Sequence, residues 1–312
     1  MATLVGVLHT SHGGFTTIPP DRWNGRREQR TYRADVPVES QEEMDEKWAR
    51  SERAKGVLRD KLAELRPDVL VIFGDDQAEC FDFNNFPGLA VYLGSTMHGR
   101  GTTAPGHPSL AQAVLTGLLG RGFDPAFMMD LPKDPPGMAH AIMTPVKFFT
   151  DGEIPTVPVL VNAYFAPQLT GERCLAVGRA VREIVEEYPE DLRVVAIGSG
   201  GLWHTPGQAN SWLNEDFDRT GLAYLEKGDI GSWVTHFDSY LAPGDDTSQD
   251  WVHVRRGVTG LPTPGGPQGG SRETLCWISA AAMAEGRPTT VVDYIPIYAS
   301  PVGSAFAYCD DL

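Results

Sequence analysis

Short apolar runs alternate with longer amphipathic stretches along most of this chain. The apolar runs have strand length and are rich in β-branched residues: VGVL near the start, VLVIF at 69–73, LAVYL at 89–93, TVPVLV at 156–161 and RVVAIG at 193–198. Between and after them, apolar residues recur at three- and four-residue spacing, which predicts helices over 41–65, 108–120, 171–187 and 271–284. This alternation predicts an α/β fold with a central, mostly parallel mixed sheet flanked by helices.

Two stretches of the chain show neither strand-like nor helix-like spacing of apolar residues. Residues 13–40 mix Gly, Pro, Arg and Asp, and residues 242–271 contain the run GVTGLPTPGGPQGGS. Both are expected to be irregular, either as lids over a pocket or as surface connections. Neither divides the chain into two halves with separate apolar cores, so we expect residues 1–312 to form a single domain.

Polar residues that could bind a metal or take part in catalysis follow several of the predicted strands. In α/β sheets, ligands bind outside the carboxyl ends of the strands, so these positions are where a site is expected. In chain order the residues are His12, Asp75, Gln77, Tyr164, Trp203 and His204. This placement favours a functional role for His12 and His204, whereas His140 lies in an expected loop and His107 is expected to cap the helix that follows it.

The segment GSGGLWH at 198–204 excludes two common site types. Ser199 has Ile197 two positions before it, so the segment is not the G-x-S-x-G turn of a serine hydrolase. Trp203 stands where a dinucleotide-binding loop needs its third glycine. What remains is a glycine-rich turn that presents His204, as expected for a general base at a pocket rim.

Composition narrows the range of partners. The formal net charge of -15 is unsuited to nucleic acid or anionic lipid, which require clustered cations. No apolar run approaches the roughly 20 residues of a membrane-spanning helix, and the start MATLVGVLHTSH lacks the features of a signal peptide. We therefore expect a cytoplasmic protein with a small-molecule partner. The four cysteines are widely spaced and are expected to be reduced.

A series of short motifs occurs in a fixed order over nearly the whole chain. They are Thr10-Ser11-His12, Gly74-Asp75-Asp76-Gln77 with Phe81-Asp82-Phe83-Asn84, Gly106-His107-Pro108-Ser109-Leu110, Met138-Ala139-His140, Pro189-Glu190-Asp191-Leu192, Gly198-Ser199-Gly200-Gly201-Leu202-Trp203-His204, Gly270-Ser271-Arg272-Glu273 and Ile295-Pro296. Each motif alone is weak. In this order they resemble the class III extradiol dioxygenases, of the protocatechuate 4,5-dioxygenase catalytic-subunit and gallate dioxygenase type.

The resemblance implies a mononuclear non-haem Fe(II) site that binds a catechol-like aromatic and O2. His12 matches the first histidine ligand, and Glu273 matches the carboxylate ligand. Without the resemblance, an acidic residue at the start of a helix would be explained by the helix dipole. His204 matches the acid/base histidine, and His140 matches a second pocket histidine. A homodimer or a small partner subunit would also fit the family.

Three further residues are candidates for substrate contact. Trp203 and Tyr164 could contact the ring, and Arg272 could pair with a substrate carboxylate. Each is as readily explained as a packing or surface residue, so the identity of the aromatic substrate stays open.

The second histidine ligand of the family is absent from this chain. The family has Asn-Asp-His after the second strand, whereas this chain has Asp75-Asp76-Gln77. A glutamine oxygen is a neutral and weaker donor than imidazole, so Fe(II) is expected to be held less tightly unless another group joins the metal shell. Asp75 is a candidate, because it shares the side of the strand on which Gln77 lies. Such a set would also favour Mn(II) or Mg(II) more than the usual set does.

Three interpretations follow from this substitution. The first is a working dioxygenase in which Gln77 or Asp75 completes the metal shell. The second is a metal enzyme with altered chemistry on an aminophenol-like or hydroxypyridone-like ring. The third is a non-catalytic partner subunit of a dioxygenase. The presence of His204, His140 and Glu273 counts against the third, because such a subunit has no physical need for them.

Overall fold

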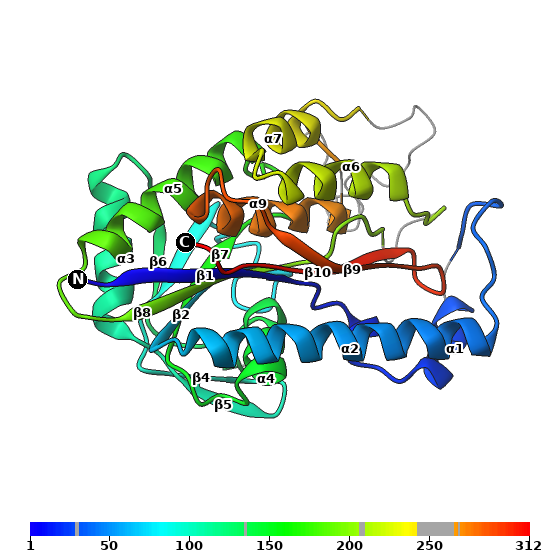
Figure 1. The fold of residues 1–312 in the computed structure, drawn as a ribbon, viewed down its shortest axis with the longest axis horizontal. Coiled ribbons are helices and arrows are strands. Elements are labelled where there is room, and N and C mark those ends of the chain that lie inside the picture. The colour runs from blue at the N-terminus through cyan, green and yellow to red at the C-terminus, as the bar shows by residue number, and fades with distance from the viewer. Residues whose placement is uncertain (29–30, 134–135, 206–209, 242–264, 268) are drawn as a thin grey trace.

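The computed structural model of the protein describes residues 1–28, 31–133, 136–205, 210–241, 265–267 and 269–312. Its centre is an eight-stranded sheet in the order β6-β3-β7-β2-β8-β1-β10-β9 (Figure 1). The strands are β1 (Thr3–Thr10), β2 (Val69–Asp75), β3 (Leu89–Tyr92), β6 (Ala126–Met128), β7 (Thr156–Val161), β8 (Arg193–Ser199), β9 (Thr290–Ile297) and β10 (Val302–Cys309).

The middle of the sheet is parallel and its margins are mixed. β2 pairs in parallel with both β7 and β8, and β8 pairs in parallel with β1. β10 runs antiparallel to β1 and to β9, and β3 runs antiparallel to β7. The predicted α/β class with a mixed central sheet is confirmed. Since β1, β2 and β8 are neighbouring parallel strands, their carboxyl ends lie together at one edge.

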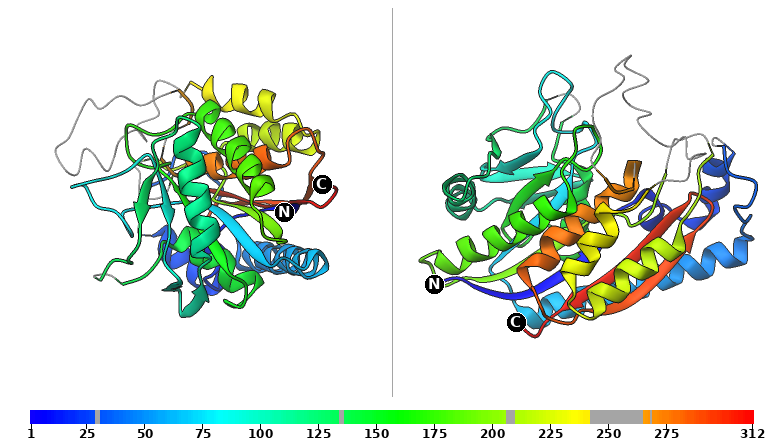
Figure 2. Two further views of the ribbon diagram at one scale, coloured as in Figure 1. Left: turned by 90° about the vertical axis from the view of Figure 1, so that its left-hand side faces the viewer. Right: turned by 90° about the horizontal axis from the view of Figure 1, so that it is seen from above.

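Helices cover both faces of the sheet, as the views from two further directions show (Figure 2). One face packs on α3 (Pro108–Gly120), α5 (Gly171–Glu187), α6 (Glu215–Glu226), α7 (Ile230–Asp238) and α9 (Thr274–Met283). The other face packs on α2 (Gln41–Leu65) and α4 (His140–Phe149), beside the hairpin of β4 (Thr96–Gly99) and β5 (Thr102–Pro105).

Alternation along β2 divides the core between these two layers. Val69, Val71 and Phe73 belong to the apolar cluster with α5 and α9, whereas Leu70 and Ile72 belong to the cluster with α2 and α4. Successive side chains of a strand point to opposite faces, so an unbroken apolar run is what a sheet covered on both sides requires.

The helices predicted over 41–65, 108–120 and 171–187 are confirmed with those bounds. Ser40 begins α2 with a capping box: its side chain accepts from the Glu43 N–H (3.2 Å), and its own N–H donates to the Glu43 carboxylate (2.7 Å). The predicted role of His107 is also confirmed, because its Nδ1 accepts a hydrogen bond from the Leu110 N–H at 3.2 Å.

Other expectations were wrong in part. His140 does not lie in a loop but is the first residue of α4, a helix so buried and short that its apolar pattern is hard to recognise. The 13–40 stretch contains η1 (Gly14–Thr16), η2 (Pro20–Arg22) and α1 (Trp23–Arg27). The helix predicted over 271–284 begins as a 3-10 turn, η3 (Gly269–Glu273), and continues as α9. Of the predicted irregular stretch 242–271, residues 242–264 and 268 lie outside the described residues.

No helix in the described part of the chain combines the length and the apolar character needed to cross a membrane. The four cysteines are free thiols, as expected, and Cys174, Cys276 and Cys309 are buried.

Candidate metal centre

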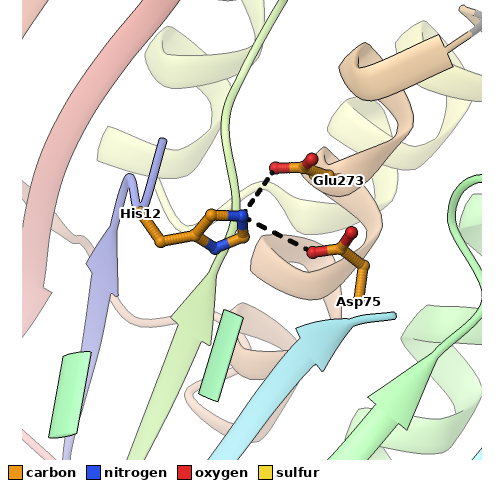
Figure 3. A group of neighbouring side chains, drawn as sticks. All are labelled: His12, Asp75 and Glu273. Carbon is orange, nitrogen blue, oxygen red and sulfur yellow. Dashed lines mark ion pairs between the residues drawn. The ribbon is translucent and has the colours of Figure 1, made fainter. Parts of the chain in front are cut away.

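His12 lies just beyond the end of β1, and its ring is held by the neighbouring strand. Its Nδ1 is 3.0 Å from the hydroxyl of Ser199, the last residue of β8. This contact turns Nε2 toward two carboxylates, with Asp75 Oδ1 at 3.6 Å and Glu273 Oε2 at 3.2 Å (Figure 3). A histidine whose one nitrogen is anchored by a neighbour presents the other nitrogen in a fixed direction, as metal-binding histidines commonly do.

Asp75, the last residue of β2, is a fully buried carboxylate. Neither of its oxygens has a hydrogen-bond partner among the described residues. Burial, together with the negative charge of Glu273, raises the pKa of Asp75 well above its usual range, and the nearby Gln77 side chain only partly opposes this rise. An uncompensated carboxylate inside a protein is costly, and a bound cation would satisfy it.

Glu273, at the end of η3, is the centre of the cluster. Its Oε2 accepts a hydrogen bond from the Gly201 N–H at 2.6 Å, while Oε1 lies 2.9 Å from Gln77 Nε2 and 3.0 Å from His204 Nε2. Burial would raise the pKa of Glu273, but His204 and His12 hold it well below the usual range. Glu273 is therefore an ionised, acceptor-only group.

His12, Asp75 and Glu273 bring one nitrogen and two carboxylate oxygens within 4.8 Å of one another. The three side chains come from the segment after β1, the end of β2 and the end of η3, so distant parts of the chain meet at the carboxyl edge of the sheet (Figure 3). An imidazole with carboxylates is a donor set that divalent ions such as Fe(II) and Mn(II) accept. The unsatisfied Asp75 oxygens and this donor set fit a divalent metal.

Gln77 reaches the same cluster from the turn after β2. Its amide nitrogen donates to Glu273 Oε1 at 2.9 Å. Gln77 and Asp75 thus both point toward Glu273, in line with the expectation that the two share a side of the strand end. Whether the Gln77 amide oxygen also binds a metal stays a prediction.

His204 faces Glu273 from the glycine-rich turn after β8. Its Nδ1 lies 3.1 Å from the Leu202 carbonyl oxygen and its Nε2 lies 3.0 Å from Glu273 Oε1. Gly270 makes room for the ring, because a Cβ on that residue would lie 2.2 Å from His204 Nε2. Burial alone would lower the pKa of His204, but the charge and hydrogen bond of Glu273, together with the Leu202 carbonyl and Asp218, outweigh burial and raise the pKa.

His140 lies against the His12 ring in an edge-on contact, with ring centroids 4.6 Å apart. Its partner is Glu79, whose Oε2 is 2.6 Å from His140 Nδ1 and accepts the His140 backbone N–H at 2.9 Å. Glu79 was missed by the sequence reasoning. Its position two residues after Gln77, in the turn that follows β2, is a signal that could have found it.

The three candidate substrate contacts lie in different surroundings. Trp203 is buried against Trp212, Phe217 and Tyr240, which are the neighbours of a core residue. Arg272 is buried and donates to backbone carbonyls of Leu169, Gly265 and Pro267.

These contacts explain Trp203 and Arg272 by packing and lend no support to a substrate role. Tyr164 is buried beside Phe165, and its contact with substrate stays a prediction.

A buried histidine and two carboxylates at the carboxyl edge of an α/β sheet form the class of site that could hold a metal ion. Comparison with known families gives the closer assignment. Residues 36–260 match the family described as the catalytic LigB subunit of aromatic ring-opening dioxygenase. The chain belongs to this family, which confirms the resemblance drawn from the motifs.

Curated relatives are similar over part of their length. A 2,3-dihydroxyphenylpropionate/2,3-dihydroxicinnamic acid 1,2-dioxygenase of Klebsiella pneumoniae subsp. pneumoniae is 29% identical over 154 residues, or 47% of each chain. A gallate dioxygenase of Pseudomonas putida is 30% identical over 125 residues, which cover 38% of this chain and 35% of that one. The chain thus spans about half or less of the length of the curated relatives it matches.

Among solved structures, an uncharacterized protein of Escherichia coli K12 is similar at 14% identity and a TM-score of 0.49. That similarity covers 97% of this chain and 99% of the other.

Proposed function

We propose that this protein is an extradiol ring-cleavage dioxygenase, which opens the ring of a catechol-like aromatic by inserting both atoms of O2. The observation that carries the proposal is the meeting of His12, Asp75 and Glu273 around one point, with both Asp75 oxygens lacking a hydrogen-bond partner among the described residues. Membership of the ring-opening dioxygenase family supports the reaction class.

His12, Asp75 and Glu273 would hold the metal, which we propose to be Fe(II), with Mn(II) as the alternative. When bound, such an ion supplies a Lewis acid that binds the diol and O2 next to each other. Gln77 donates to Glu273 and thereby orients one of the two carboxylates.

His204 is the proposed acid and base. Its Nδ1 faces the Leu202 carbonyl, an acceptor, so Nδ1 carries a proton. Nε2 faces the ionised Glu273 Oε1 at 3.0 Å and so carries a proton as well in the metal-free protein. With Glu273 engaged by a metal, Nε2 would lose that proton and be the nitrogen that takes a phenolic proton from the diol and returns it as the ring opens. His140, oriented by Glu79, lies against the His12 ring and would orient the substrate or O2.

The test is metal loading followed by turnover. Protein loaded with Fe(II) without oxygen should bind about one ion per chain and then consume O2 in the presence of a catechol. Protein that binds no divalent ion would overturn the proposal. Metal binding without O2 consumption by any catechol would favour altered chemistry on an aminophenol-like ring instead.

The Gln77→His variant tests the unusual position directly. If the Gln77 side chain contributes to the metal shell, imidazole should raise Fe(II) affinity, measured by competition with a chelator. Unchanged affinity would place Gln77 outside the metal shell and leave Asp75 as the replacing ligand. Association as a homodimer or with a small partner subunit, and location in the cytoplasm, stay predictions.

A further inference from the structure

A second polar site lies on the face of the sheet that α2 and α4 cover, outside the metal centre. It is a cavity of about 400 Å³. None of the residues of the metal centre lines it. The lining residues come from η1, α2, the β4–β5 turn and α4: Thr16, Thr17, Trp48, Glu52, Lys55, Arg59, Arg100, Thr144, Lys147 and Phe148. Figure 1 shows α2, α4 and the hairpin gathered on this side.

The wall of the cavity carries more positive than negative charge. Four cations, Lys55, Arg59, Arg100 and Lys147, face a single carboxylate, Glu52. This excess occurs in a chain whose formal net charge is -15. A local potential opposite in sign to that of the whole molecule indicates an anionic ligand.

The contacts of these cations leave most of their charge uncompensated. Lys147 Nζ donates to the Arg100 carbonyl oxygen at 2.8 Å, and Arg59 Nε donates to the Phe148 carbonyl oxygen at 3.1 Å. A carbonyl satisfies a donor without cancelling its charge. Among the described residues, neither Arg59, Arg100 nor Lys147 has an ion pair within 4.0 Å.

Lys55 is the buried member of the set. Its side chain is only 5% exposed, and its Nζ donates to the Thr16 carbonyl oxygen at 2.9 Å. It also forms an ion pair with Glu52, whose side chain is 47% exposed. Burial lowers the pKa of Lys55, with Glu52 opposing this effect. Glu52 is thus the solvent-exposed partner of this ion pair, and Lys55 is the buried one.

Two features indicate that the ligand is more than a bare inorganic ion. The Lys55 ammonium lies over the rings of Trp48 and Phe148, 5.2 and 4.3 Å from their centroids, so aromatic side chains line the cavity beside the charge. Thr144, 2% exposed, lines the same cavity with a buried hydroxyl that has no hydrogen-bond partner among the described residues.

We propose that this cavity, which we call the cationic pocket, binds a small aromatic carboxylate. The cations Arg59, Arg100 and Lys147 would receive the carboxylate, and Trp48 and Phe148 would contact the ring. The cavity volume is within the range of small-molecule sites. The cationic pocket and the metal centre share no side chain, and the charge of Arg100 links them, because it lowers the pKa of Glu79.

The test is an isothermal calorimetric titration of benzoate into the metal-loaded protein. One equivalent should bind, and the charge-neutralising variants Arg59→Gln and Lys147→Gln should each weaken binding by about five- to tenfold. Both side chains are exposed, so both variants should fold. The matched control is Arg53→Gln, the same change of charge on an exposed residue of α2 outside the pocket, which should leave binding unchanged.

Three outcomes would overturn the proposal. Benzoate binding that disappears in His12→Ala would place the ligand at the metal centre instead. Equal weakening by Arg53→Gln would show attraction to overall charge and no specific pocket. Inorganic phosphate that binds while benzoate does not would remove the aromatic part of the ligand.

Discussion

The metal centre and the cationic pocket are both polar and partly buried, but their charges are arranged differently. At the metal centre, two carboxylates converge with histidines, and Asp75 is left without a hydrogen-bond partner among the described residues. In the pocket, one carboxylate faces four cations. The first arrangement lacks a cation and the second lacks an anion, so each region is completed by a ligand of opposite sign.

The regions also differ in how the chain supports them. The metal centre is assembled at the ends of β1, β2 and β8, where neighbouring parallel strands hold side chains in place. The pocket is built on helix surfaces, where α2 presents Trp48, Glu52, Lys55 and Arg59 at four- and three-residue spacing. The strand ends bring the side chains of the metal centre together around one point, whereas the helix faces spread the charges of the pocket over a broad surface. The predictions below test this difference.

The largest effect is expected from His204→Phe at the metal centre. Removing a general acid and base should lower kcat by about 100- to 10,000-fold. Metal content should stay near that of the unchanged protein, because His204 is not one of the three grouped ligands. Steady-state O2 consumption and metal analysis measure the two quantities, and full activity would remove His204 from the mechanism.

Asp75→Asn should change the stability of the metal-free protein and its metal affinity in different directions. In the metal-free protein, this change removes a buried carboxylate that has no hydrogen-bond partner among the described residues, and should be neutral or stabilising by about 1–2 kcal/mol at pH 7. Metal affinity should fall at the same time. Urea unfolding of metal-free protein measures the first effect and chelator competition measures the second.

The neighbouring residue provides the matched control. Asp76 accepts hydrogen bonds from the backbone N–H groups of Glu79, Cys80 and Phe81 at 3.2, 2.8 and 3.0 Å. Asp76→Asn should therefore destabilise the metal-free protein by about 1–3 kcal/mol. If both variants lose stability equally, Asp75 has a structural role and the contrast between the two residues fails.

Lys55→Met tests the pocket in the same way. It leaves the buried Thr16 carbonyl without its donor and should destabilise the protein by about 1–3 kcal/mol. Metal content should not change, since Lys55 is not part of the metal cluster. Thermal unfolding and metal analysis check both statements, with Arg53→Gln expected within about 0.5 kcal/mol of the unchanged protein. Loss of metal from the Lys55 variant would show that the two regions are not independent.

A smaller effect is expected from Glu79→Gln. The carboxylate of Glu79 lies 2.6 Å from His140 Nδ1, and an amide would orient the ring less firmly. Loss of an orienting partner should lower kcat/KM by about 10- to 100-fold. Metal affinity is the comparison measurement. A change in metal affinity with unchanged kcat/KM would show that the Glu79–His140 pair supports His12 instead of the substrate.

The smallest effect is expected in the pH dependence of stability, through Asp218, which supports the turn at residues 200–204. Burial raises the pKa of Asp218 from 3.8 to about 8, and its oxygens contact the Trp203 N–H and the Tyr294 hydroxyl, both at 2.8 Å. The folded state thus retains a proton that the unfolded chain releases. The stability from this group is present below about pH 4 and is lost as pH rises toward 8.

Asp218→Asn resembles the protonated acid and should flatten this dependence between pH 5 and 8, by about 1 kcal/mol or more. Urea unfolding of both proteins at several pH values measures the difference. Identical slopes for the two proteins would show that Asp218 does not titrate in this range.

Much of the fold and part of the site could be predicted from local pattern. Apolar periods predicted α2, α3 and α5 with their bounds, because amphipathic spacing and capping residues act over a few positions. His12 and Asp75 were placed by a simple rule, that polar residues after parallel strands meet at one edge. Glu273 could not be separated from a helix-dipole residue without the family resemblance.

Other features depended on contacts between distant residues. His140 was expected in a loop because α4 is short and almost wholly buried, so no polar face marks it as a helix. The buried positions of Trp203 and Arg272 became visible only from their neighbours. Glu79 was missed because its partner His140 is 61 positions away in sequence.

The sequence by itself determined the α/β alternation, which follows from local spacing and residue type. The order of its motifs indicated the family, and through that resemblance it predicted the candidate ligands His12, Asp75 and Glu273. Only the tertiary structure decided that Asp75 lacks a hydrogen-bond partner among the described residues, that Gln77 donates to Glu273, and that four cations share one cavity. The physical reason is that burial and pairing arise between segments far apart in the chain, which no local pattern records.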